Sequence, residues 1–73
     1  MPKLGVFSGA EVCRILESDG FRAVRQRGSH IAMQKVTPDG TTTVPVPNHS
    51  TVRKGTLLAI IRQSGLPREL FMR

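Results

Sequence analysis

Histidine and arginine side chains are the groups in this sequence with the greatest potential for chemistry. His30 follows a Gly-Ser pair close to Arg25 and Arg27, and His49 follows a stretch of alternating valine and proline. Histidine titrates near neutral pH and can move a proton, while arginine donates paired hydrogen bonds to phosphate oxygens. The combination suits proton transfer beside a bound phosphate. Spacing alone also allows His30 to be an exposed strand residue beside a turn.

A second group of cations stands at positions 53 and 54, just before an apolar segment that has helical spacing. Arg53 and Lys54 would oppose the dipole at the start of that helix, and a phosphate held by the free backbone N–H groups would offset this cost. The remaining arginines are expected to be ordinary solvated charges; these include Arg14, Arg22, Arg62 and Arg68.

Length and charge restrict the class of protein. The chain has 73 residues, with 11 Lys plus Arg against 5 Asp plus Glu and a net charge of +6, which favours a nucleic acid or an acidic protein as partner. It has three Phe and no Trp or Tyr, so extended base stacking is not expected. Its one cysteine, Cys13, is expected to be a small buried side chain. We expect no disulfide, metal or cofactor.

The sequence predicts a single domain over residues 1–73, with a core of about 8–66 and a short tail at 67–73 that is frayed or forms one extra turn. It has neither the pattern of a signal peptide nor an apolar run long enough to cross a bilayer. We therefore expect a cytoplasmic protein without a membrane partner.

Two helices are predicted from capping signals and apolar periodicity. Ser8 and Glu11 form a capping box, and Gly20 is a typical helix stop, which together predict a helix at about 9–19. A second helix is predicted at about 54–64, with an apolar stripe formed by Leu57, Leu58, Ile60 and Ile61. Gly65 ends it, and Pro67 cannot extend it.

Between the helices, the pattern changes to that of short strands separated by turns. Strands are predicted at 21–27, 31–36 and 41–46, with turns at Gly28-Ser29 and Pro38-Asp39-Gly40. The predicted fold is α+β, in the order α-β-β-β-α, with a three-stranded antiparallel sheet and two helices on one face. This architecture resembles a double-stranded-RNA-binding domain.

Turn chemistry also predicts the strand register. A two-residue Gly28-Ser29 loop pairs Arg27 with His30 and places Val24 opposite Met33. In the next hairpin, a two-residue loop places His30 opposite His49 and a four-residue loop places it opposite Pro47. Both registers put His30, Arg25 and Arg27 on one face. The opposite, core-facing side then contains Val24, Ile31, Met33, Val44 and Val46.

Three motifs of the chain resemble the HicA toxin family of HicA/HicB toxin-antitoxin modules. They are Arg25-Gln26-x-Gly28-Ser29-His30, Val44-Pro45-Val46-Pro47-Asn48-His49, and Lys54-Gly55-Thr56-Leu57 with Ile60 and Arg62-Gln63-Ser64-Gly65-Leu66. The resemblance implies a ribosome-independent mRNA interferase, an endoribonuclease whose catalytic histidine is His30, and a cognate HicB-like antitoxin that blocks the site. His49 is a possible second catalytic residue, on the register argument alone. The expected RNA contacts are Arg25, Arg27, Gly28, Ser29, Lys35, Arg53 and Lys54.

Two alternatives to an RNA-cleaving toxin remain. A non-catalytic RNA-binding module would use the same basic face without shortening the RNA. A domain that binds only an acidic protein would show no salt-dependent affinity for RNA.

Overall fold

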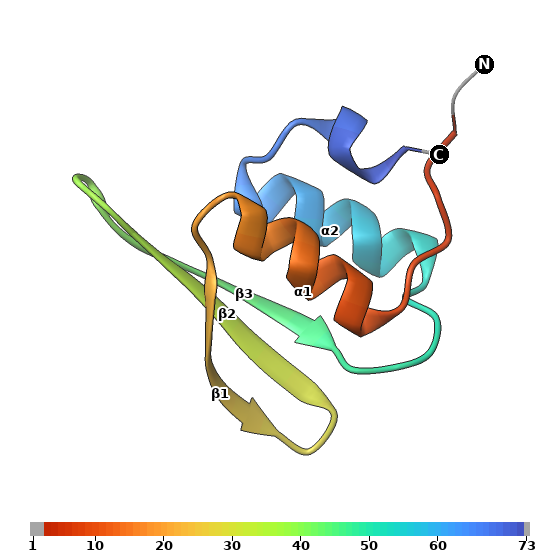
Figure 1. The fold of residues 1–73 in the computed structure, drawn as a ribbon, viewed down its shortest axis with the longest axis horizontal. Helices are drawn as coiled ribbons and strands as arrows, with labels where there is room; N and C mark the ends of the chain where they lie inside the picture. The colour runs from red at the N-terminus through yellow and green to blue at the C-terminus, as the bar shows by residue number, and fades with distance from the viewer. Residues whose placement is uncertain (1–2, 73) are drawn as a thin grey trace.

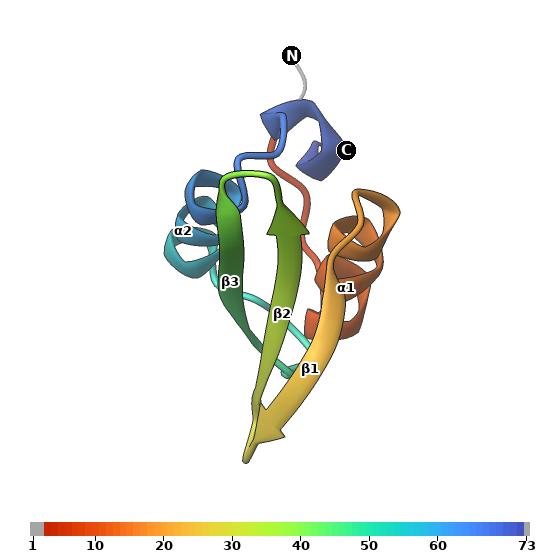
Figure 2. The same cartoon turned by 90° about the vertical axis from the view of Figure 1, so that its left-hand side faces the viewer.

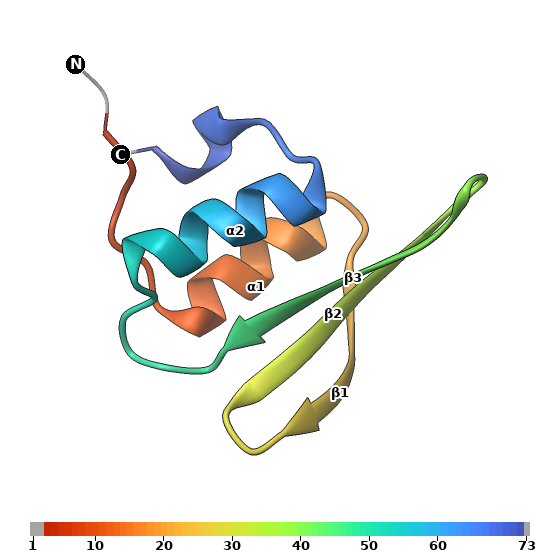
Figure 3. The same ribbon diagram turned by 180° about the vertical axis from the view of Figure 1, so that it is seen from behind.

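The computed structural model describes residues 3–72 and confirms the α+β fold in the order α-β-β-β-α. Its elements are α1 (Gly9–Ser18), β1 (Arg22–Arg27), β2 (His30–Thr37), β3 (Gly40–Pro47), α2 (Lys54–Ser64) and the 3-10 helix η1 (Arg68–Phe71). Figure 1 and the reverse view in Figure 3 show both helices on the same side of the sheet. The other face of the sheet is left open.

Helix α1 begins at the predicted capping box. The Ser8 amide donates to Glu11 Oε1 at 2.9 Å, and the Glu11 amide donates to Ser8 Oγ at 3.1 Å. Two backbone donors of the first turn are thereby satisfied. The helix ends at Ser18 with Asp19 as its cap, and Gly20 follows with a φ of 99°, a left-handed conformation that glycine adopts without strain.

Helix α2 begins directly after Arg53 without a side-chain cap and ends at Gly65, whose φ is 72°. Leu57 and Ile60 are buried, which confirms that this side of the helix faces the core. The apolar stripe predicted for this helix was too wide, because the side chain of Leu58, which was included in it, is 37% exposed. Within residues 3–72, no helix is long and apolar enough to span a membrane.

The sheet has the order β1-β2-β3, and Figure 2 shows its three strands in front of the two helices. Arg27 pairs with His30, as the Gly28-Ser29 turn predicted, and Gly28 has the positive φ of 55° that this turn needs. In the second hairpin, His30 pairs with Pro47. This is the register predicted for the longer loop, although Thr37 and Gly40 also pair and shorten the turn.

Strand β1 contains a bulge that corrects one part of the predicted register. Ala23, rather than Val24, pairs with Met33, and the register shifts between Ala23 and Arg25. A bulge adds one unpaired residue and breaks the period-two alternation of side chains. Val24 was therefore wrongly predicted to be in the core: it is 52% exposed.

The core lies between the open sheet and the helices. It consists of Phe7, Val12, Leu16, Phe21, Met33, Val44, Val46, Val52, Leu57, Ile60, Leu66 and Phe71, with Ile31 packed against its edge. Phe7 and Phe71 contact each other edge to face, with ring centroids 6.1 Å apart. The Leu4–Met72 bridge joins the two ends of the described chain. The predicted tail therefore forms one extra turn, the 3-10 helix η1, and the Leu4–Met72 bridge holds it in place. Residues 1, 2 and 73 lie outside the described part.

Candidate active site

The open face of the sheet brings together His30, Arg25 and Arg27, which come from adjacent strands. Arg27 pairs with His30 and Arg25 pairs with Ala32, so all these side chains point away from the helices. Together with exposed Val24 they line a hollow of about 300 Å³, which we call the sheet hollow. Both arginines are therefore placed to bind an anion next to the His30 ring.

His30 also lines a second hollow, of about 350 Å³, at the end of the sheet. We call it the histidine hollow, because His49 lines it as well. The other lining residues are Pro45, Pro47, Thr51, Arg53 and Thr56. The structure thus brings the two imidazoles to one site, together with a guanidinium and two hydroxyl groups.

The backbone around His49 is held in place from two sides. The Asn48 amide donates a hydrogen bond to the Ser29 carbonyl, which ties the segment after β3 to the turn before His30. The Gly9 amide donates to the His49 carbonyl at 2.8 Å. Since both bonds use backbone atoms of residues 48 and 49, they position His49 without engaging its imidazole.

The Gly28-Ser29 turn shapes the site through its backbone. Gln26 Nε2 donates to the Gly28 carbonyl at 3.1 Å, and the Ser29 carbonyl accepts the bond from Asn48. Gly28 is exposed and has open space around its α-carbon. The turn therefore offers an uncrowded backbone beside His30, where a ligand could approach closely.

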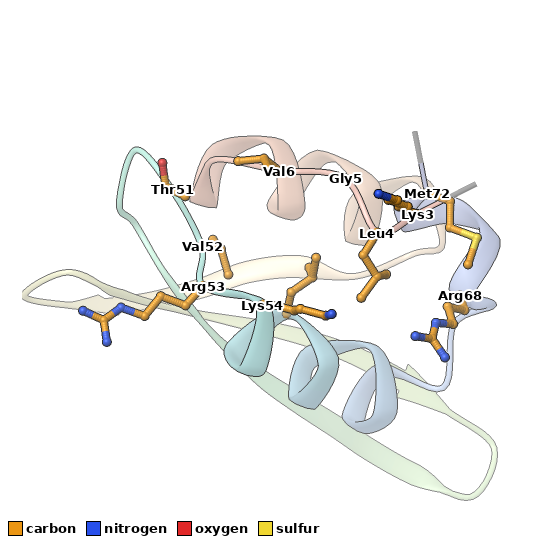
Figure 4. A pocket seen from close by; sticks show the side chains of 11 residues that line it. Lys3, Leu4, Gly5, Val6, Thr51, Val52, Arg53, Lys54, Arg68 and Met72 are labelled. Carbon is orange, nitrogen blue, oxygen red and sulfur yellow. The ribbon is translucent and has the colours of Figure 1, made fainter. Parts of the chain in front are cut away.

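Arg53 and Lys54 diverge at the start of α2. Arg53 lines the histidine hollow, whereas Lys54 does not. Figure 4 shows the Arg53 side chain extending away from Lys54, which points towards Leu4 and Arg68. Of this predicted pair of phosphate contacts, Arg53 is the one that the fold places beside the histidines.

Lys35 lies apart from the other predicted contact residues. It shares the helix-facing side of β2 with Met33, and its Nζ lies 2.8 Å from Asp19 Oδ2 and 5.9 Å from the centroid of the Phe21 ring. Its charge is therefore paired with a carboxylate at the end of α1. The structure does not bring Lys35 to the sheet hollow or the histidine hollow.

Cys13 is partly buried beside the core. Burial and the nearby Glu17 carboxylate raise the pKa of its thiol, which keeps the sulfur protonated and a poor nucleophile. Among residues 3–72, no three His, Cys, Asp or Glu side chains are grouped so that they could hold a metal ion. The ionisable groups available for proton transfer at the site are the two histidines.

Thr51 and Thr56 are site residues that the sequence analysis did not single out. Thr56 lies in the first turn of α2 and Thr51 in the loop before it, and both line the histidine hollow. Their hydroxyl groups can donate to phosphate oxygens. Thr56 could have been predicted from the sequence, because it lies one helical turn after Arg53. Thr51 could not, because its place at the site depends on a loop conformation that no periodicity predicts.

The fold and the site define a small basic α+β domain with a histidine pair at one end of its open sheet. A family model described as the HicA toxin of bacterial toxin-antitoxin systems matches residues 9–66. The chain therefore belongs to the HicA toxin family, which makes it the toxin of a toxin-antitoxin pair and implies a cognate antitoxin as partner. No curated protein matches the chain.

Proposed function

We propose that this toxin is an mRNA interferase that cleaves RNA with His30 as a catalytic residue. The observation that supports the proposal is the placement of His30 where the sheet hollow and the histidine hollow meet, with Arg25 and Arg27 on one side and His49 and Arg53 on the other. RNA is a polyanion that carries its own nucleophile, the 2′-hydroxyl. A protein with paired histidines and arginines can cleave it without a metal or cofactor.

The proposed reaction is an in-line displacement at phosphorus. His30 accepts the proton of the 2′-hydroxyl as the 2′-oxygen forms its bond to phosphorus. The bond between phosphorus and the 5′-oxygen breaks, and that oxygen takes up a proton. His49 lines the same hollow and is the second imidazole able to supply this proton.

The arginines have an electrostatic role in this proposal. Negative charge builds up on the non-bridging oxygens in the transition state, and donors already aimed at those oxygens stabilise it. Arg53 lines the histidine hollow, and Arg25 and Arg27 border His30 from the sheet side. A guanidinium offers two parallel donors to one phosphate, which a lysine cannot do. These three residues are therefore proposed to bind the phosphate that is cleaved and its neighbours.

The experiment compares the wild-type protein and His30→Ala on a long mRNA. We expect the wild type to shorten the RNA and His30→Ala to do so at least about 10²-fold more slowly, the usual cost of removing a general acid or base. His30 is exposed and has no side-chain hydrogen bond within residues 3–72, so the variant should keep its far-UV spectrum. Arg14→Ala, on the exposed side of α1, serves as the matched surface control.

Two results would refute the proposal. If the His30→Ala protein cleaved RNA at close to the wild-type rate, His30 would not be catalytic. If the wild type bound RNA in a salt-dependent manner but never shortened it, the domain would be a non-catalytic RNA-binding module. Absence of any RNA binding would instead favour a domain whose only partner is an acidic protein.

A further inference from the structure

A third hollow, larger than the other two, lies next to the histidine hollow, and Arg53 lines both of them. It has a volume of about 610 Å³ and is bordered by the N-terminal segment, the start of α2 and the end of the chain around η1 (Figure 4). We call it the terminal groove. Its lining residues are Lys3, Leu4, Gly5, Val6, Thr51, Val52, Arg53, Lys54, Leu57, Arg68 and Met72.

Among the described residues, every charged side chain that lines the terminal groove is a cation. Lys3, Arg53, Lys54 and Arg68 line it, and all four side chains are exposed. None of them forms a salt bridge with a carboxylate in the part of the chain that the structure describes. Cations brought together in this way repel one another and attract a polyanion. The groove is therefore suited to binding several negative charges in a row.

The apolar residues of the groove contribute mainly to its floor. Val52 is 4% exposed and Leu57 is 1% exposed, so both belong to the core rather than to a free apolar surface. Within residues 3–72, the lining contains no aromatic side chain on which a base could stack. A strand bound here would be held through its phosphates, without selection for particular bases.

The three hollows are connected through residues they have in common. Thr51 and Arg53 line both the terminal groove and the histidine hollow. His30 and Pro45 line both the histidine hollow and the sheet hollow. A continuous basic path therefore leads from Arg25 and Arg27, past the two histidines, to the cations of the terminal groove.

We propose that the terminal groove is a binding site for the RNA strand on one side of the scissile phosphate. The strand passes from His30 over Arg53 into the groove, where its phosphates contact Lys54, Lys3 and Arg68. The inference rests on the proposed function. Continuity with the histidine hollow favours RNA as the occupant over an acidic segment of a protein, since an RNA strand that is cleaved at His30 continues beyond the scissile phosphate.

The test uses the full-length protein and two lengths of RNA. Lys3→Glu/Arg68→Glu reverses two groove cations, and Arg14→Glu/Arg62→Glu makes the same charge change at exposed helix positions that line none of the three hollows. One substrate is a trinucleotide without terminal phosphates, which carries one phosphate besides the scissile one, and the other is an RNA of about 20 nucleotides, longer than a typical single-strand site.

For the longer RNA, we expect the groove variant to have a KM at least about 10-fold higher than the control variant, with kcat unchanged, since remote binding energy is lost. Its log-log dependence of affinity on salt should be shallower by about 1.4, for two lost phosphate contacts at about 0.7 each. Cleavage of the trinucleotide should be equal in the two variants. This pattern would support a substrate site outside the catalytic hollow.

Equal KM values for the groove and control variants on the longer RNA would overturn the inference while leaving the proposed function intact. The same holds if the groove variant lost affinity for a poly-glutamate peptide but kept its affinity for RNA, because the groove would then bind an acidic protein segment. A wild-type protein that cleaved neither RNA would refute the proposed function itself, and with it the path through the groove.

Discussion

His49 is the residue that we propose acts on the same phosphate as His30. Both residues line one hollow, and the backbone carbonyl of His49 accepts the hydrogen bond from the Gly9 amide. We predict that His49→Ala slows RNA cleavage by about 10²-fold and changes a bell-shaped pH profile of kcat into one with a single limb, because one of the two groups proposed to transfer a proton is lost. Single-turnover cleavage rates between pH 5 and 9 provide the measurement.

Asn48→Ala is the matched control for His49. Asn48 is also exposed and also engages the fold through its backbone, since its amide binds the Ser29 carbonyl. The control should keep both limbs of the pH profile. A His49→Ala protein with a normal rate and both limbs retained would limit His49 to ordering the loop between β3 and α2.

Substitutions of basic residues on the two faces of the sheet should differ in their effect on RNA affinity. Arg25 and Arg27 lie with His30 on the open face, while Lys35 is on the helix side with Asp19. We predict that Arg25→Gln/Arg27→Gln weakens RNA binding and lowers its salt slope by about 0.7 per lost contact. Lys35→Gln should leave RNA affinity unchanged and cost at most about 1 kcal/mol of stability, as expected for a partly exposed ion pair.

Filter binding at several salt concentrations measures these affinities, and chemical denaturation measures the stability. An equal loss of RNA affinity in the Lys35→Gln protein would mean that RNA reaches the helix side of the sheet. The prediction would then be wrong, and Lys35 would return to the set of contact residues.

The junction between α1 and β3 depends on the absence of a side chain at Gly9. A Cβ placed there would lie 2.8 Å from the Asn48 α-carbon and still closer to the Pro47 carbonyl. We predict that Gly9→Ala lowers the free energy of unfolding by about 1–3 kcal/mol, because the backbone next to His49 must move. Urea denaturation measures the change.

Gly55→Ala provides the comparison for Gly9→Ala. Gly55 has no atom within 4 Å of its added Cβ and lies within α2, so the same substitution should stabilise the protein by about 0.4–1 kcal/mol through a less flexible unfolded chain. Equal effects of the two substitutions would contradict the proposed close contact between α1 and the end of β3.

Local chemistry explains which elements could be predicted from the sequence. The capping box of Ser8 and Glu11 and the Gly28-Ser29 turn act over three or four residues, and both are formed as expected. The β1 bulge was missed because Ala23 and Val24 are both compatible with a regular strand. The side of the sheet on which Lys35 lies could also have been predicted, because its alternation with Met33 places it on the helix-facing side.

The candidate site was predictable only in part for a related reason. His30, Arg25 and Arg27 share a face through the register of one hairpin, which a turn motif determines. The terminal groove instead requires Lys3 and Arg68 to line one hollow, and the Leu4–Met72 bridge joins the segments that carry them at the two ends of the described chain. No periodicity or motif predicts that these two residues line one groove, so Arg68 was not predicted as an RNA contact.

For the molecule as a whole, the net positive charge opposes folding while it favours binding to a polyanion. A charge of +6 on 73 residues produces self-repulsion in the folded state, and the basic path through the three hollows concentrates it. Added salt screens this repulsion. We predict that Tm rises by several degrees between about 0.01 M and 0.15 M salt, where each kcal/mol of added stability raises Tm by about 4–8 °C.

Differential scanning calorimetry of the wild type and Lys3→Gln/Arg68→Gln tests this prediction. The variant removes two of the six net positive charges from the terminal groove, so its Tm should rise less with salt than that of the wild type. RNA affinity should fall as salt is added, while Tm rises, because salt ions compete with the protein's cations for the phosphates. A Tm that fell with salt would mean that attractive ion pairs outweigh the repulsion. The cations that line the groove would then stabilise the fold, whereas the prediction has them destabilise it by mutual repulsion until a polyanion binds.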